Sequence, residues 1–135
     1  MRRRAPALAA LALLAGGCGQ PSAALFTVTR SGSIADAKLR LRVLDDGHVS
    51  CNGGPLREIS SKELIDARAA AGDLGDPAKH HVTLQPRNGS TLQYAFTIDG
   101  DTVRFADNST GQDPAMYKAA LLVRELAKGP CRLPR

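Results

Sequence analysis

The most reactive side chains in the sequence are those of three cysteines, Cys18, Cys51 and Cys131. A cysteine can be acylated, can bind a metal or can form a disulfide. Cys51 and Cys131 lie about 80 residues apart and belong to no CxxC pair, which favours a disulfide over a zinc site. Such a bond would contribute on the order of 4 kcal/mol in the chain-entropy model. A metal site that adds nearby histidines is the alternative.

Catalytic and metal-binding sets are difficult to assemble from the other residues. His80 and His81 are neighbours, and neighbours in a strand point to opposite faces, so they cannot easily share one metal with His48. No serine lies in a GxSxG motif. The paired acids at positions 45–46 precede a glycine, which is a turn pattern. The sequence therefore predicts no enzyme activity, no metal and no cofactor.

The first 18 residues have the pattern of an export signal. Residues 2–4 are arginines, and residues 7–15 are only Ala and Leu. As a helix this run would be roughly 14 Å long, about half of the ~30 Å hydrocarbon core, so it is too short to span a membrane. The following Leu-Ala-Gly-Gly-Cys segment, which ends at Cys18, resembles the lipobox of bacterial lipoproteins.

That resemblance implies that the chain is divided into three parts. Residues 1–17 would be a signal peptide, residues 18–24 a tether lipidated at Cys18, and residues 25–135 a single domain. The domain would lie on the extracytoplasmic face of the cell membrane, held there by diacylglyceryl and palmitate chains. This compartment permits disulfides. Simple secretion, with a cut near residues 21–23, is the alternative.

Composition and charge argue against a nucleic-acid partner. The whole chain has a net charge of +5, but removing the three arginines of the export segment leaves 15 basic against 13 acidic residues, or +2. Aromatic residues make up 4% of the chain and Trp is absent. Binding of single strands needs exposed aromatic rings for stacking. The sequence therefore predicts no nucleic-acid partner.

Alternating hydrophobicity predicts the first strands. Residues 25–29 are rich in β-branched and aromatic side chains, and residues 38–44 alternate between apolar and basic ones. Residues 30–36 between them read as a Gly/Ser loop. Asp46-Gly47 has the sequence of a type I′ turn, so residues 48–51 would form a short return strand.

A second group of strands follows in the later half of the chain. Residues 81–85 and 92–98 both alternate, and Asn88-Gly89 between them has the sequence of a hairpin turn. Asp99-Gly100 turns the chain again, and Val103 and Phe105 would face the core from the last strand. The sequence predicts a three-stranded meander here.

Two helices are marked by their ends. Ser60 and Glu63 form a capping box, and Gly72, Gly75 and Pro77 are expected to end the first helix. The second helix should run from Pro114 to Lys128 after an Asp113 cap. The predicted fold is α+β, an antiparallel sheet of about five to six strands with both amphipathic helices on one face.

Three basic residues share one face of the strand at 38–44, namely Lys38, Arg40 and Arg42. Such a stripe is commonly a solvated strand face whose charges discourage edge pairing. It can also meet anionic headgroups or cell-envelope polymers, at about 1 kcal/mol per charge near an anionic surface. The sequence allows both interpretations of the stripe.

The domain has a second set of family-like motifs. Residues 29–33 read Thr-Arg-Ser-Gly-Ser after the first strand, residues 94–100 form a Tyr-Ala-Phe-Thr-Ile-Asp-Gly segment, and a closing helix begins at Pro114. Over most of residues 25–127 this order resembles emfourin, a small inhibitor of thermolysin-like metallopeptidases. The resemblance implies the fold of that family and inhibition of secreted metallopeptidases. It makes one segment the candidate partner contact: Arg30, Ser31, Gly32, Ser33 and Ile34.

The sequence predicts a non-catalytic cell-envelope lipoprotein that presents a small binding domain outside the membrane. Its expected partners are the membrane, through the lipid on Cys18, and an unidentified protein or envelope polymer. The alternative is an emfourin-like inhibitor displayed on the cell surface. For residues 30–34, the alternative to a partner contact is a plain surface connection between two strands.

Overall fold

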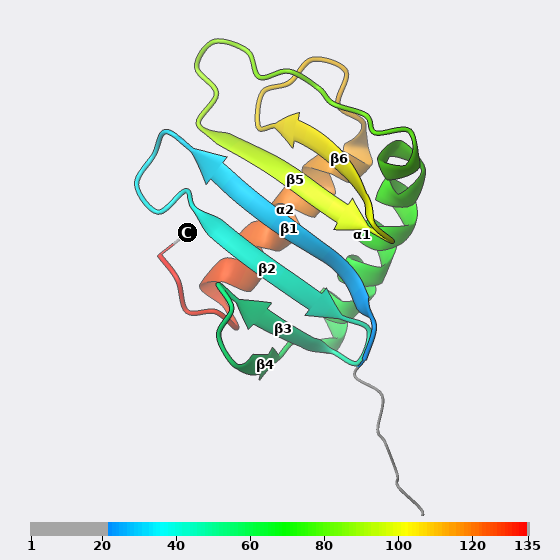
Figure 1. Cartoon of the computed structure of the whole chain (residues 1–135). Coiled ribbons are helices and arrows are strands. Elements are labelled where there is room, and N and C mark those ends of the chain that lie inside the picture. Colours follow the sequence, from blue (N-terminus) through cyan, green and yellow to red (C-terminus); the bar gives the residue numbers. More distant parts are fainter. Residues whose placement is uncertain (1–21, 135) are drawn as a thin grey trace, which may run out of the picture.

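The computed structural model describes residues 22–134 and has an α+β fold (Figure 1). Six antiparallel strands form one open sheet in the order β4-β3-β2-β1-β5-β6, and both helices lie on the same face of it. The strands are β1 (Ala24–Gly32), β2 (Leu39–Leu44), β3 (His48–Cys51), β4 (Leu56–Glu58), β5 (Leu92–Ile98) and β6 (Asp101–Ala106). The helices are α1 (Ser61–Lys79) and α2 (Pro114–Lys128). The predicted fold class is confirmed.

Strand β1 is central and joins the two halves of the sheet. Its Val28 lies opposite Leu41 of β2 and Phe96 of β5, and all three side chains are completely buried. The next residues on each strand point the other way because side chains alternate along a strand. The predicted alternation of β2 is confirmed: its apolar residues are buried, while Arg40 and Arg42 are exposed.

Glycine turns connect the hairpins in two different geometries. Asp99 and Gly100 both have positive φ, +50° and +87°, as a two-residue type I′ turn requires. In the β2–β3 turn only Gly47 has positive φ, +88°. That turn has three residues between Leu44 and His48, so it is a type I turn closed by a left-handed glycine rather than the predicted type I′.

Helix α1 begins as predicted but ends later. The Ser60 side chain accepts from the Glu63 amide, and the Glu63 carboxylate accepts from the Ser60 amide, which confirms the capping box. The helix continues past Gly72, Gly75 and Pro77 to Lys79. These residues were expected to stop it. Leu74 and Ala78 are fully buried one turn apart, and their burial outweighs the helix propensity of about 1 kcal/mol lost at each glycine.

The predicted strand at residues 81–85 is not a strand of the sheet. Thr83 makes one parallel bridge to Arg104, with hydrogen bonds of 2.9 and 2.8 Å joining Val82 and Leu84 to the Arg104 backbone. Pro86 lacks an amide hydrogen, so the ladder cannot continue through it. The predicted meander is therefore the single hairpin β5–β6, and Asn88-Gly89 lies in a longer connection. Strand β4 was not predicted.

Helix α2 and the disulfide match their predictions. Asp113 caps the Met116 amide, Pro114 is the first helical residue, and the helix ends at Lys128 before Gly129. Cys51 at the end of β3 is bonded to Cys131 just after α2, with a Cα–Cα distance of 5.9 Å. This bond fastens the helix layer to the sheet.

The predicted signal peptide, Cys18 and the first part of the tether lie outside the described residues. Ser22 is the first described residue, and its hydroxyl donates to Asp46 at 2.7 Å. The Ala23 carbonyl accepts from the Asp45 amide at 3.0 Å. The chain therefore enters the domain beside the β2–β3 turn. Across residues 22–134, neither helix combines the length and the apolar character needed to cross a bilayer.

Candidate functional site

His48 begins β3, whereas the adjacent His80 and His81 follow α1, and each of the three lies beside an acid. His48 contacts Asp46 at 3.0 Å, whereas His81 lies 3.8 Å from Asp101. Hydrogen bonds from Ser22 and His48 hold the pKa of the Asp46 carboxyl below its usual value. Within residues 22–134, no three His, Cys, Asp or Glu side chains gather as a metal site would require.

The candidate contact segment is divided between a strand and a loop. Arg30, Ser31 and Gly32 belong to β1, while Ser33 and Ile34 begin the β1–β2 loop at residues 33–38. The predicted loop at residues 30–36 therefore starts three residues too early. Extended pairing reaches Gly32 because it is opposite Leu92 of β5.

Arg30 is a bracing residue rather than an exposed contact. Its side chain is buried, with 4% exposed, on the helix-facing side of β1. Its Nε donates to the Ala37 carbonyl at 2.9 Å and its Nη2 to the Asp36 carbonyl at 3.0 Å. Hydrogen bonds from a charged donor are stronger than neutral ones. The guanidinium therefore fixes the β1–β2 loop, whose Ser33 and Ala35 remain exposed.

Gly32 is required by close approach of two backbones. A Cβ atom added there would lie 1.9 Å from the Thr91 carbonyl oxygen, which also accepts from the Ser33 amide at 3.1 Å. No side chain fits without moving that backbone. The glycine at position 32 is thus explained by packing between the β1–β2 loop and the start of β5.

A polar cluster after β6 fastens the connection that precedes β5. The Asp107 carboxylate accepts hydrogen bonds from Ser90, Thr91 and Leu92 at 2.6 to 3.3 Å. Partial burial raises the pKa of Asp107, but these hydrogen bonds outweigh it and the pKa lies below its usual value. Ser109 donates to the Leu84 and Gln85 carbonyls. The sequence analysis did not predict this cluster. Its signal is the run Asp-Asn-Ser at residues 107–109, because these side chains commonly form hydrogen bonds with nearby backbone groups.

A cavity of about 290 Å³ lies between the β1–β2 loop, the start of β5 and helix α2. Tyr94 and Phe105 stack within it, with ring centroids 5.4 Å apart, and Ile34 and Tyr117 contribute further apolar surface. Burial raises the pKa of the Tyr94 hydroxyl, while the nearby Arg30 charge opposes that shift. The lining also includes Arg30, Asp107 and Arg124, so the cavity offers both apolar and charged surface beside the candidate contact segment.

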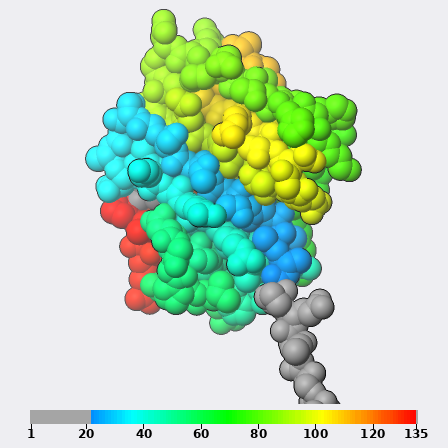
Figure 2. Space-filling view, viewed as in Figure 1, coloured from blue at the N-terminus to red at the C-terminus, as the bar shows by residue number. Residues whose placement is uncertain are grey.

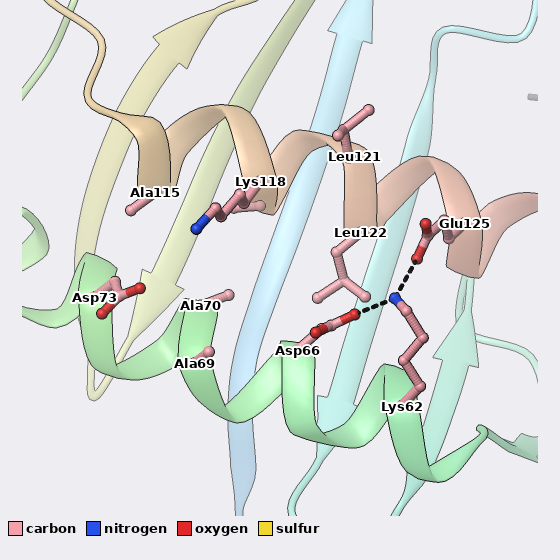
Figure 3. Close-up of a pocket in the computed structure, with 11 residues that line it drawn as sticks. Lys62, Asp66, Ala69, Ala70, Asp73, Ala115, Lys118, Leu121, Leu122 and Glu125 are labelled. Atoms are coloured by element: carbon pink, nitrogen blue, oxygen red, sulfur yellow. Dashed lines mark hydrogen bonds and ion pairs between the residues drawn. The ribbon is translucent and has the colours of Figure 1, made fainter.

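A second depression lies between α1 and α2, on the outer surface of the helix layer (Figure 3). The Lys62 ammonium lies 2.6 Å from Asp66 and 3.8 Å from Glu125, so it bridges α1 and α2. The hydrogen bond to Asp66 raises the pKa of Lys62. Alanines and Leu122 form much of the remaining lining. An ion pair that bridges two helices is the pattern of a helix–helix contact.

The predicted basic stripe lies on the uncovered face of the sheet. Lys38, Arg40 and Arg42 are exposed there, and neither helix covers this side (Figure 1, Figure 2). Arg104 of β6 points to the same face, because the register places it opposite Ala95, Ala95 opposite Thr29, and Thr29 opposite Arg40. The sequence did not single out Arg104, since only the order of the strands brings it to the same face as the stripe.

The comparisons give no relative with a known role. No protein-family model matches the sequence, and no curated protein and no solved structure shows significant similarity to the chain.

Proposed function

We propose that the chain is a lipid-anchored, non-catalytic envelope protein whose domain presents a binding surface at the end of the sheet far from the membrane. The observation that carries this proposal is the course of β1 (Figure 1). The strand begins at Ala24, the last residue of the predicted tether, and ends at Gly32, directly before the β1–β2 loop. Nine extended residues span about 30 Å.

Contacts at both ends of β1 support this orientation. Ser22 is bonded to Asp46 at the tether end, and Arg30 braces residues 36–37 at the other end. A rigid loop loses little conformational entropy when it binds. An anchor at Cys18 would therefore leave the braced loop and the adjoining 290 Å³ cavity directed away from the bilayer.

The anchor is tested by Cys18→Ala in cells, followed by membrane fractionation and mass measurement of the protein. We expect the variant to leave the membrane fraction or to stay uncleaved, because no thiol accepts the lipid. Cys51→Ser with Cys131→Ser is the matched control and should stay in the membrane. Normal cleavage and retention of the Cys18→Ala protein would refute lipidation at this position.

The binding surface is tested by pull-down of the tethered protein from cell envelopes. Ser33→Asp adds a charge to the exposed loop, and Ala24→Asp adds the same charge at the opposite end of β1. We expect partners captured by the wild type to be lost with Ser33→Asp and kept with Ala24→Asp. Equal capture by both variants would place the partner surface elsewhere.

The second candidate function is inhibition of secreted thermolysin-like metallopeptidases, and it is favoured by the braced loop. Rigid backbone on both sides of Ser33 and Ile34 suits a segment that enters a protease cleft. We expect inhibition of such an enzyme by the wild type and by Ala24→Asp, and weaker inhibition by Ser33→Asp and Ile34→Asp. Gly32→Arg is unsuitable because of the Thr91 carbonyl. No inhibition of several such enzymes, or equal inhibition by the loop variants, would exclude this candidate.

A further inference from the structure

The uncovered face of the sheet is hollowed into a shallow trough that crosses four strands. Two hollows, of about 500 and 160 Å³, meet at Thr29 and Ser31 of β1. One is bounded by the turn at residues 52–53, and the other by residues 83–86 beside β6. Figure 2 views this face, where β1, β2, β5 and β6 all reach the surface. The polar side chains of the trough include Lys38, Arg40, Asn52, Thr29, Ser31, Thr83, Gln85, Gln93 and Arg104.

Strand register places these side chains in order across the trough. Arg40 lies opposite Thr29, Thr29 opposite Ala95, and Ala95 opposite Arg104. Neighbouring strands are about 4.8 Å apart, so the Arg40 and Arg104 backbones are separated by roughly 14 Å. Thr29 and Ala95 lie between the two cations, and Ser31 and Gln93, two residues along the same strands, pair beside them. The trough therefore has positive ends and a neutral, hydrogen-bonding middle.

No carboxylate balances these cations. Neither hollow is lined by Asp or Glu, whereas both depressions on the helix side contain acidic residues. Within the described part of the chain, Lys38, Arg40 and Arg104 form no ion pair, while Lys62 and Arg68 do. Cations grouped without counter-charges in a concave surface concentrate a positive potential that attracts anions.

We propose that this trough binds a linear anionic glycan of the cell envelope. Guanidinium groups bind carboxylates and phosphates through paired hydrogen bonds. The hydroxyls of Thr29 and Ser31 and the amide of Gln93 can both donate and accept, as sugar hydroxyls do. The row across four strands suits an extended chain better than a single small ion. This inference rests on the proposed function only for placing the glycan in the envelope.

The surroundings of the trough disfavour other polyanions and partners. Large apolar side chains are exposed at Leu56, Ile65, Tyr117 and Leu121, and none of them lines the trough, so it lacks groups that insert into a bilayer. The only exposed aromatic ring among these is Tyr117 on α2, on the other side of the sheet, so bases have no stacking platform here. Strands β2, β1 and β5 are paired on both sides, and the outer side of β6 is already hydrogen-bonded at Arg104 by Val82 and Leu84, so a peptide strand cannot pair there.

The test measures binding of polygalacturonate, a linear carboxylated glycan, to the full-length protein purified in a neutral detergent. We expect saturable binding that weakens as salt is added, and no binding of neutral dextran. Arg40→Gln with Arg104→Gln should weaken binding at least ten-fold. Lys118→Gln with Lys128→Gln removes the same charge from α2 and should change binding less than two-fold. Thr29→Val should weaken binding about three-fold without changing its salt dependence.

Several results would overturn the inference. These are no binding of polygalacturonate at low salt, equal loss in the two double variants, or competition by dextran. Tighter binding to phosphatidylglycerol vesicles or to polyphosphate than to the glycan, with the same dependence on Arg40 and Arg104, would assign the trough to a different anion. The measurement needs no membrane anchor, so its failure leaves the Cys18→Ala result standing, and the reverse also holds.

Discussion

The two faces of the sheet are made by the same strands and have opposite chemistry. On the covered face, Val28, Leu41 and Phe96 are completely buried against the helices. One residue after Phe96, Thr97 points to the open face and is partly exposed. The Thr97 hydroxyl lies 2.9 Å from the Thr102 hydroxyl of β6. Because alternate residues serve alternate faces, stability and surface chemistry are separated by a single position in each strand.

This comparison explains why the open face tolerates uncompensated charge. Burial of the apolar side chains supplies about 25 cal/mol per Å², and the disulfide also acts on the covered side. The cations at Arg40 and Arg104 are exposed, so they need no buried partner. Substitutions should therefore affect folding on one face and binding on the other.

The largest expected effect is that of Phe96→Ala. Phe96 packs against Phe26 and Phe105, with ring centroids 5.3 and 5.8 Å away, and truncation leaves a cavity. We expect a loss of about 5 kcal/mol in the free energy of unfolding, measured with urea. The control Thr97→Ala, on the open face of the same strand, should cost less than about 1 kcal/mol. Similar losses in the two variants would contradict the division between faces.

Removing the disulfide should have the next largest effect. Cys51→Ser with Cys131→Ser frees the segment after α2 from the sheet, and we expect a loss of about 4 kcal/mol. Reduction of the wild type should produce a similar loss in the same unfolding measurement. Thiol labelling of the folded wild type should find neither cysteine reactive. Two reactive thiols before reduction would contradict the bond.

Gly32→Ala tests the close contact at the far end of β1. We expect a loss of about 2 kcal/mol, because the added methyl group forces the Thr91 carbonyl to move. Gly72→Ala in α1 is the matched control, since, apart from its chain neighbours and its own helix backbone, no atom lies within 4 Å of the added Cβ. That change should stabilise the helix by about 0.5 kcal/mol. An unchanged Gly32→Ala protein would show that the β1–β2 loop is not held against β5.

The smallest predicted effect, at Asp107, depends on pH. Its folded-state pKa is lowered, so its stabilising contribution is present above its ordinary pKa of 3.8 and is lost as the pH falls through the folded-state value. Asp107→Asn should cost about 1 kcal/mol at pH 7. Melting temperatures from pH 7 to pH 2 should fall less for the variant than for the wild type. Parallel curves would exclude a contribution from this carboxylate.

Local sequence signals predicted most of the fold. The capping box at Ser60, the Asp113 cap and the alternation of β2 each depend on neighbours within a few residues, and each is confirmed. Wrong predictions arose where distant contacts decided the outcome. Buried Leu74 and Ala78 extend α1 through glycines and a proline, and residues 81–85 meet the sheet by one parallel bridge.

The candidate site divides in the same way. The sequence by itself determined which side chains could pair or carry charge, including the Cys51–Cys131 bond and the stripe at Lys38, Arg40 and Arg42. Only the tertiary structure buried Arg30 beneath the loop that it braces and brought Arg104 into the row of Arg40. The physical reason is sheet order: β1 pairs with both β2 and β5, so residues more than 60 positions apart share one face.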